Sequence, residues 1–154
     1  MEKAHAILMT GNNKRGFIDR IPKCYKRFSN GYNSASLVFE KLNISDRIES
    51  ITVIGDRRYM YDCLDTSRAR KPFHLVEQKK DATFVDNVLD SYDAMLKNFR
   101  ITGERGALYV SGDAPFRKSR TISFFVERIH EDTDIAIHLM NENSVRRFYE
   151  SVYR

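Results

Sequence analysis

The segment 105–117 contains the residue best placed to do chemistry, Asp113. A short run of strand-forming residues, 107–110, ends at a glycine and leads directly into Asp113 and Pro115. Such a run is typical of a buried strand in a parallel sheet, and open α/β sheets bind ligands at the carboxyl ends of their strands. A carboxylate there can coordinate a divalent cation that carries phosphate oxygens. The structural alternative is that Asp113 caps a helix beginning near Arg117 or forms an Asx-turn with its own backbone.

A tight, basic turn is the second candidate site. An apolar run at residues 4–9 leads into a turn, residues 11–16, that is rich in glycine, asparagine and basic side chains. Glycine and asparagine accept positive φ, so the amides of such a turn can approach a phosphate closely. Arg15 can bind two phosphate oxygens at once, and Lys23 supplies a mobile point charge. The spacing matches neither the Walker P-loop nor the G-x-G-x-x-G fingerprint. The alternative is a solvated basic loop.

The elements that must position these residues alternate between strands and helices. Apolar runs predict five strands, at residues 4–9, 51–55, 72–76, 107–110 and 134–139. Apolar residues at helical spacing predict four helices, at residues 34–42, 84–99, 121–129 and 144–153. This alternation predicts an α/β fold: a three-layer, doubly wound, mostly parallel sheet with right-handed crossovers. Neither a linker nor a repeat interrupts the pattern, so we expect a single domain over residues 1–154.

The order of these elements makes a geometric prediction. If the chain reverses direction across the sheet between the first and the fourth strand, a topological switch point forms there. The turn 11–15 and Asp113 would then lie side by side, at the carboxyl ends of adjacent strands.

Composition limits the classes of partner. The net charge is +5, which favours anionic partners without choosing between a nucleotide, a nucleic acid and a membrane surface. No apolar run approaches the roughly 18 residues needed to cross a bilayer, and the first residues lack the layout of a signal peptide. The two cysteines, Cys24 and Cys63, have no metal-ligand spacing. We therefore expect a cytoplasmic protein with reduced thiols and no membrane partner.

Together, these segments resemble the nucleotidyltransferases of the glycosyltransferase-A-like fold, which include sugar-phosphate nucleotidylyltransferases, cytidylyltransferases and molybdenum cofactor guanylyltransferases. In that superfamily the first strand enters a loop similar to L-A-G-G-x-G-T-R, followed by P-K. Here residues 8–15 read L-M-T-G-N-N-K-R, and Pro22-Lys23 matches the P-K. Residues 111–116, S-G-D-A-P-F, resemble the metal-binding G-D-x-P-F segment. Two loop glycines are replaced, by Thr10 and Asn13.

The resemblance implies a role for each matching residue. Arg15 and Lys23 would neutralise a triphosphate, and Asp113 would hold magnesium; these three form the implied catalytic set. The loop would wrap the nucleotide through Met9, Thr10, Gly11, Asn12 and Asn13, together with Arg15 and Lys23.

The implied activity is magnesium-dependent nucleotidyl transfer. A nucleoside monophosphate passes from a nucleoside triphosphate to a phosphorylated acceptor, and pyrophosphate leaves. Family members usually carry a second metal-binding acid further along, and none is placed here, so the resemblance also implies a minimal member or one truncated at its C-terminus.

Two other classes of function remain open. Basic charge and exposed aromatic side chains such as Tyr25, Tyr32, Tyr59 and Tyr61 would suit a non-catalytic module on the same scaffold that binds a nucleotide, a nucleic acid or another partner. Convergence of Arg15, Lys23 and Asp113 on one site would favour the enzyme. A glycosyltransferase normally carries a D-x-D pair, whereas alanine and proline follow Asp113 here.

Two further segments have structural interpretations. Asn87, near the start of a predicted helix, could approach a ligand, but capping of that helix is favoured. Residues 77–80 are expected to form a solvated turn.

Overall fold

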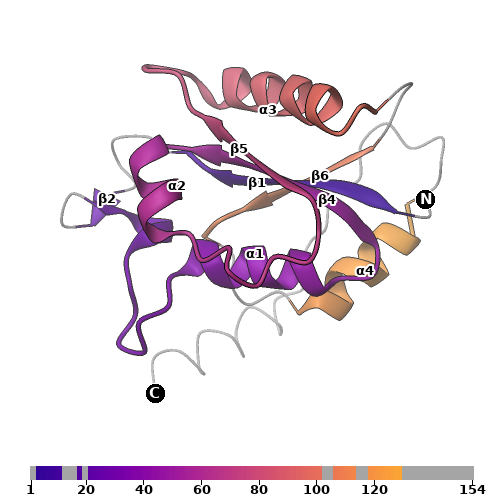
Figure 1. Ribbon diagram of the computed structural model, residues 1–154, viewed down its shortest axis with the longest axis horizontal. Coiled ribbons are helices and arrows are strands. Elements are labelled where there is room, and N and C mark those ends of the chain that lie inside the picture. The colour runs from indigo at the N-terminus through magenta and orange to yellow at the C-terminus, as the bar shows by residue number, and fades with distance from the viewer. Residues whose placement is uncertain (1–2, 12–16, 19–20, 102–105, 114–117, 130–154) are drawn as a thin grey trace, which may run out of the picture.

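A parallel sheet with helices on both faces forms the centre of the molecule. The computed structural model describes residues 3–11, 17–18, 21–101, 106–113 and 118–129 (Figure 1). Within these residues the sheet has four strands in the order β5-β4-β1-β6, and all neighbouring pairs are parallel. Its strands are β1 (Ala4–Thr10), β4 (Ile48–Gly55), β5 (Phe73–Glu77) and β6 (Ala107–Ser111).

Three helices lie between these strands in the chain, and a fourth follows β6. They are α1 (Ser34–Ile44), α2 (Arg57–Cys63), α3 (Phe84–Asn98) and α4 (Ser119–Glu127). Between β1 and α1 the chain adds a short antiparallel pair, β2 (Phe17–Ile18) with β3 (Ile21–Pro22), and a 3-10 turn, η2 (Lys23–Tyr25). Within the described residues no helix has the length and apolar character needed to span a bilayer.

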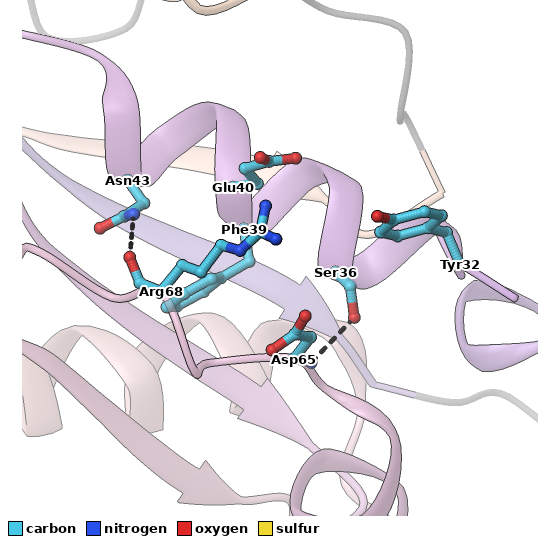
Figure 2. Close-up of a pocket in the computed structure, with 7 residues that line it drawn as sticks. All are labelled: Tyr32, Ser36, Phe39, Glu40, Asn43, Asp65 and Arg68. Atoms are coloured by element: carbon cyan, nitrogen blue, oxygen red, sulfur yellow. Dashed lines mark hydrogen bonds between the residues drawn. The ribbon is translucent and has the colours of Figure 1, made fainter.

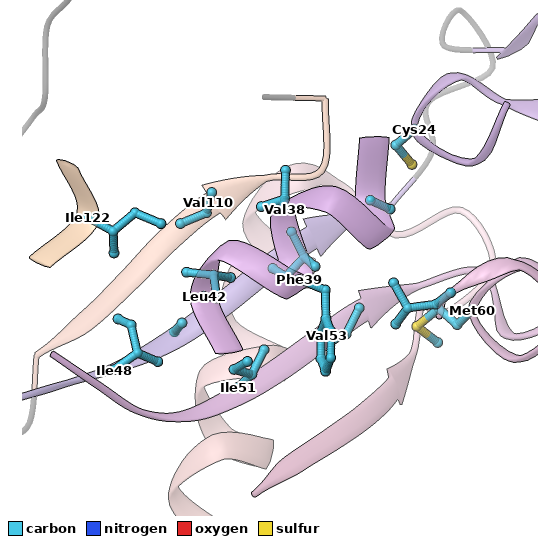
Figure 3. Packing of buried hydrophobic residues seen from close by; sticks show 14 of the residues in the cluster. Cys24, Val38, Phe39, Leu42, Ile48, Ile51, Val53, Met60, Val110 and Ile122 are labelled. Carbon is cyan, nitrogen blue, oxygen red and sulfur yellow. The ribbon is translucent and has the colours of Figure 1, made fainter. Parts of the chain in front are cut away.

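The sheet separates two apolar layers. Alternate residues of β1 point to opposite faces, as the two-residue period of a strand requires. Ala4, Ala6 and Leu8 join the larger cluster, in which α1 and α4 cover the sheet (Figure 3). Ile7 lies in the smaller cluster beneath α3, with Met95 from that helix. Figure 1 shows α3 on one side of the sheet and α1 with α4 on the other.

The predicted fold class is confirmed: the sheet is parallel and the architecture is α/β. From β1 the chain moves outward through β4 to β5, then returns to place β6 on the other side of β1. This reversal creates the predicted switch point between β1 and β6. The fifth predicted strand, 134–139, and the predicted tail helix, 144–153, lie outside the described residues, and the single-domain assignment stays a prediction.

Local hydrogen bonds explain where the helices begin. Asn33 caps α1: its side-chain oxygen accepts from the Ser36 amide at 2.8 Å, and its side-chain nitrogen donates to the Cys63 carbonyl at 2.7 Å. Thr83 caps α3 in a reciprocal capping box with Asp86. Because these caps fix the first turn of each helix, they also fix which residues face the carboxyl edge of the sheet.

Candidate active site at the carboxyl edge of the sheet

The carboxyl ends of β1 and β6 meet as predicted. Met9 lies opposite Ser111 in the ladder, and the Gly112 amide donates to the Met9 carbonyl at 2.8 Å. Gly11 follows β1 and Asp113 follows β6, so these two residues flank the switch point. A Cβ on Gly112 would lie 3.0 Å from Thr10 Cγ2, so a glycine lets the two chain segments approach this closely.

The structure brings Lys23 and Asp113 together. Lys23 Nζ lies 3.5 Å from Asp113 Oδ2, although the residues are far apart in sequence. Lys23 reaches this position because η2 begins directly after Pro22 and runs beside the end of β1. Both side chains are substantially exposed, at 59% and 42%. Exposed ion pairs contribute little to stability. A bound ligand could therefore replace this ion pair with little loss of folding free energy.

The helix-capping alternative for Asp113 is wrong. The N-cap of α4 is Lys118, and no side chain caps that helix. The Asp113 amide instead donates to Ser111 Oγ at 3.3 Å, and its carboxylate faces Lys23.

Buried hydrogen bonds around Thr10 stabilise the carboxyl end of β1. Thr10 Oγ1 donates to the Ile54 carbonyl at 2.9 Å and accepts from the Tyr25 hydroxyl at 2.8 Å. Burial raises the pKa of Tyr25. Burial, followed by the charge of Asp113, raises the pKa of Cys24 to about 12, so this thiol stays protonated. The Thr10 side chain is therefore committed to these two buried hydrogen bonds, and its carbonyl accepts from Cys24 Sγ at 3.8 Å.

The other predicted site residues divide into two groups. Met9 is half-buried and packs beneath α3. Asn12, Asn13 and Arg15 lie outside the described residues. The prediction that Tyr25 is an exposed aromatic residue is wrong, because its side chain is only 1% exposed.

Two amide side chains that the sequence did not assign to the site lie against Gly11. A Cβ at Gly11 would stand 2.6 Å from Gln78 Oε1 and 3.2 Å from Asn87 Nδ2. The capping role favoured for Asn87 is wrong, because Thr83 caps α3. Gln78 directly follows β5, and the position of a polar residue after a parallel strand is the signal that could have identified it. Segment 77–80 is therefore more than a solvated turn.

The described residues hold no group of three or more metal-ligating side chains. A groove does lie elsewhere, between α1 and the segment after α2, and Figure 2 shows Ser36, Glu40, Asp65 and Arg68 around one part of it. Its wider part, of about 430 Å³, extends toward Arg27. None of Gly11, Lys23 and Asp113 lines either part.

Comparisons with known proteins find similarity in fold but not in sequence. No family model matches the sequence, and no curated protein sequence matches it. Solved structures do match. Rv0371c from Mycobacterium tuberculosis H37Rv superposes with a TM-score of 0.57 at 9% identity, covering 81% of this chain and 59% of that one. A 4-diphosphocytidyl-2C-methyl-D-erythritol synthase from Anaerococcus prevotii gives 0.58 at 8% identity, covering 92% and 60%.

A CMP:2-keto-3-deoxy-manno-octonic acid synthetase complexed with CTP gives a TM-score of 0.55 at 15% identity, covering 86% of this chain and 48% of that one. The chain thus spans between about half and three-fifths of the length of these neighbours. Likeness at such low identity shows the fold alone. The chain shares the α/β fold of these neighbours, the nucleotide-diphospho-sugar transferase-like fold.

Proposed function

We propose that this chain is a magnesium-dependent nucleotidyltransferase acting as a single domain. It would transfer a nucleoside monophosphate from a nucleoside triphosphate to a phosphorylated acceptor, with release of pyrophosphate. The observation that carries the proposal is the approach of Lys23 and Asp113 to 3.5 Å at the switch point, beside Gly11. A structural ion pair would need neither the exposed glycine turn nor the strand ends around it.

The residues present fit a magnesium ion. Magnesium keeps several waters and is usually held by one or two carboxylates together with substrate phosphates. Asp113 supplies one exposed carboxylate, and the triphosphate would supply further oxygens. The bound ion would withdraw charge from the phosphate oxygens and orient the triphosphate for attack.

The side chains of the site have distinct tasks in this proposal. The absence of a side chain at Gly11 lets the triphosphate approach the main chain, and Arg15 and Lys23 neutralise its oxygens. A phosphate oxygen of the acceptor attacks the α-phosphorus, the bond to the bridging oxygen breaks, and pyrophosphate leaves with that electron pair. Lys23 stabilises the charge that develops on the transferring phosphoryl group.

One neighbour supports a nucleotide ligand. The CMP:2-keto-3-deoxy-manno-octonic acid synthetase structure holds CTP, which makes CTP the first nucleotide to test. The alternative of a non-catalytic nucleotide- or nucleic-acid-binding module loses one of its aromatic residues, because Tyr25 is in the core. The free thiols of Cys24 and Cys63 agree with the cytoplasmic location that belongs to this proposal.

Asp113→Asn tests the proposal by titration calorimetry. The substitution keeps the size of the side chain and removes the charge that would hold magnesium. We expect the wild-type protein to bind a nucleoside triphosphate more tightly with magnesium than with EDTA, and we expect Asp113→Asn to lose most of that difference. Asp93→Asn, an exposed change on α3, is the matched control. Equal affinities with and without magnesium in the wild-type protein would contradict the proposal.

Lys23→Ala separates binding from chemistry when calorimetry is combined with a turnover assay. A charge that acts on the transition state lowers turnover more than ground-state binding. We expect pyrophosphate release with a panel of phosphorylated acceptors to fall by about 100- to 1,000-fold, as for other preorganised electrostatic groups. Lys97→Ala, an exposed lysine of α3, should leave the rate unchanged.

A further inference from the structure

Three consecutive residues of η2 each contact the carboxyl end of a strand or the residues just after it. Lys23 Nζ lies 3.5 Å from Asp113 Oδ2, after β6. Cys24 Sγ donates to the Thr10 carbonyl at 3.8 Å, and the Tyr25 hydroxyl donates to Thr10 Oγ1 at 2.8 Å, both at the end of β1. The ion pair is exposed, whereas Cys24 and Tyr25 are buried. Two buried side chains thus hold η2 against β1, and the third extends to Asp113.

Tyr25 makes the stronger of the two buried contacts. Its hydrogen bond has the ordinary length for two hydroxyl groups, whereas a thiol is a weak donor. Burial raises the pKa of Tyr25, so its hydroxyl keeps the proton that it donates. The acceptor is itself held in place, because Thr10 Oγ1 donates to the Ile54 carbonyl at 2.9 Å. Through Thr10, the Tyr25 hydroxyl therefore connects η2 to both β1 and β4.

The contacts of Lys23 itself fix its position far less. A lysine side chain is a flexible four-carbon stem, and an exposed ion pair adds little energy to hold it in one place. The Lys23 carbonyl accepts from the Lys26 amide at 3.3 Å, which is a hydrogen bond within the turn and not to the sheet. The place of the ammonium group beside Asp113 therefore depends on where η2 lies relative to β1.

We infer that Tyr25 is a positioning residue, which holds Lys23 beside Asp113 before any ligand binds through its buried hydrogen bond to Thr10. Loss of the hydroxyl would let η2 shift relative to β1, and the ammonium group would then spend less time at the site. The consequence for turnover rests on the proposed function, in which Lys23 acts on the transferring phosphoryl group. The effect on the position of Lys23 does not depend on any activity.

Carbodiimide cross-linking measures the approach of Lys23 to Asp113 without nucleotide. The reagent activates a carboxylate, and an amine in contact with it displaces the activating group to form an amide bond that mass spectrometry detects. We expect Tyr25→Phe to lower the yield of the Lys23–Asp113 cross-link by at least about threefold, as loss of one hydrogen bond can shift such an equilibrium. The exposed pair of Lys79 and Asp90, at 2.8 Å, is the internal control, and its yield should not change.

Two substitutions at Thr10 examine the same hydrogen bond from its other end. Thr10→Val removes the acceptor and should lower the Lys23–Asp113 yield as Tyr25→Phe does. Thr10→Ser keeps the hydroxyl and should retain the wild-type yield. Tyr61→Phe, which removes a hydroxyl from a side chain that is 64% exposed, is the matched control for loss of a tyrosine hydroxyl. An unchanged Lys23–Asp113 yield in Tyr25→Phe would overturn the inference.

Turnover shows whether Tyr25 acts through Lys23. We expect Tyr25→Phe to slow pyrophosphate release by at least about tenfold with little change in nucleotide affinity, because a displacement of about 1 Å can cost about 100-fold. In a Lys23→Ala protein the same change should have no further effect, since residues that act through one group are not additive. Equal effects of Tyr25→Phe with and without Lys23 would overturn positioning through Lys23.

The two assays distinguish this inference from the proposed function. A wild-type protein that forms the Lys23–Asp113 cross-link in a Tyr25-dependent way, but releases no pyrophosphate with any nucleotide and acceptor, would contradict the proposed function and support the positioning of Lys23. A protein that turns over nucleotide at the same rate in wild-type and Tyr25→Phe forms would support the proposed function and overturn the role of Tyr25.

Discussion

At the residue scale, we expect a substitution of Gly11 to affect nucleotide binding far more than stability. A methyl group there would stand 2.6 Å from Gln78 Oε1, the far end of a flexible side chain, and 3.2 Å from Asn87 Nδ2, which would have to shift by only a few tenths of an ångström. We expect Gly11→Ala to change the free energy of unfolding by less than about 1 kcal/mol, as surface changes usually do. Nucleotide affinity should nevertheless fall by more than about tenfold, because the methyl group blocks close approach to the main chain.

Urea unfolding and calorimetry check this prediction together. Gly55→Ala is the contrasting variant, because its methyl group would meet the Thr10 hydroxyl, which Tyr25 and Ile54 hold in place. That variant should lose stability as well as binding. A Gly11→Ala protein that binds nucleotide as tightly as the wild type would show that this turn does not touch the ligand.

At the element scale, the position of α3 depends on its capping box. The Thr83 hydroxyl donates to Asp86 Oδ2 at 2.7 Å and accepts from the Asp86 amide at 3.2 Å. The hydrogen bond from Thr83 is the main reason that the pKa of Asp86 lies below its usual value. Since Asn87 follows in the same turn, this box also orients the amide against Gly11.

The capping box makes stability depend on pH in a defined direction. We expect Thr83→Ala to cost about 1 kcal/mol at pH 7, which is typical for loss of an N-cap. A lowered carboxyl pKa stabilises the fold above the unfolded value of about 3.9, and that contribution is lost as the pH falls through the folded pKa. The difference between wild type and variant should therefore shrink below about pH 4 in urea titrations. A difference that stays constant to pH 2 would contradict a role for the charged carboxylate.

Sequence patterns located the strands better than the small elements. Apolar runs predicted β1, β4, β5 and β6 to within a few residues, because strands of a parallel sheet are rich in apolar residues. β1 and β4 are buried, whereas β5 and β6 are mostly only partly buried, so the expectation of a buried strand at 107–110 was wrong in that respect. They missed α2, whose sequence R-R-Y-M-Y-D-C buries only Met60 and so has no apolar stripe. A short helix of this kind depends on its cap, Asp56, and on the loop length between β4 and β5.

The candidate site was predictable where topology alone decides it. The order of elements placed Asp113 beside the turn after β1, and Lys23 followed from its position just after that turn. The orientation of Asn87 was not predictable, because it depends on the rotation of α3 about its axis. The burial of Tyr25 likewise follows from its hydrogen bond to Thr10, which no local pattern reveals.

At the scale of the whole molecule, the parallel sheet gathers the chemistry at one edge. Gly11, Gln78 and Asp113 come from segments far apart in the chain. Gly11 and Gln78 directly follow strands of the same sheet, and Asp113 lies two residues after the end of a third. The groove beside α1 lies apart from these residues. Figure 2 shows that its lining residues come from α1, from Tyr32 just before that helix, and from Asp65 and Arg68 after α2. Because the two locations are separate, a nucleotide bound at the carboxyl edge should change the residues there and leave those of the groove unchanged.

The most direct measurement is a titration of the isotope-labelled protein with magnesium and CTP, or ATP if CTP does not bind, followed by amide NMR. The account predicts that the largest shifts occur at Gly11, Gln78, Gly112 and Asp113, and that they disappear when EDTA removes the metal. The amide resonances of Ser36, Asp65 and Arg68, which line the groove, should not shift. Shifts centred on the groove, or no shifts with any nucleotide, would contradict a nucleotide site at the carboxyl edge of β1 and β6.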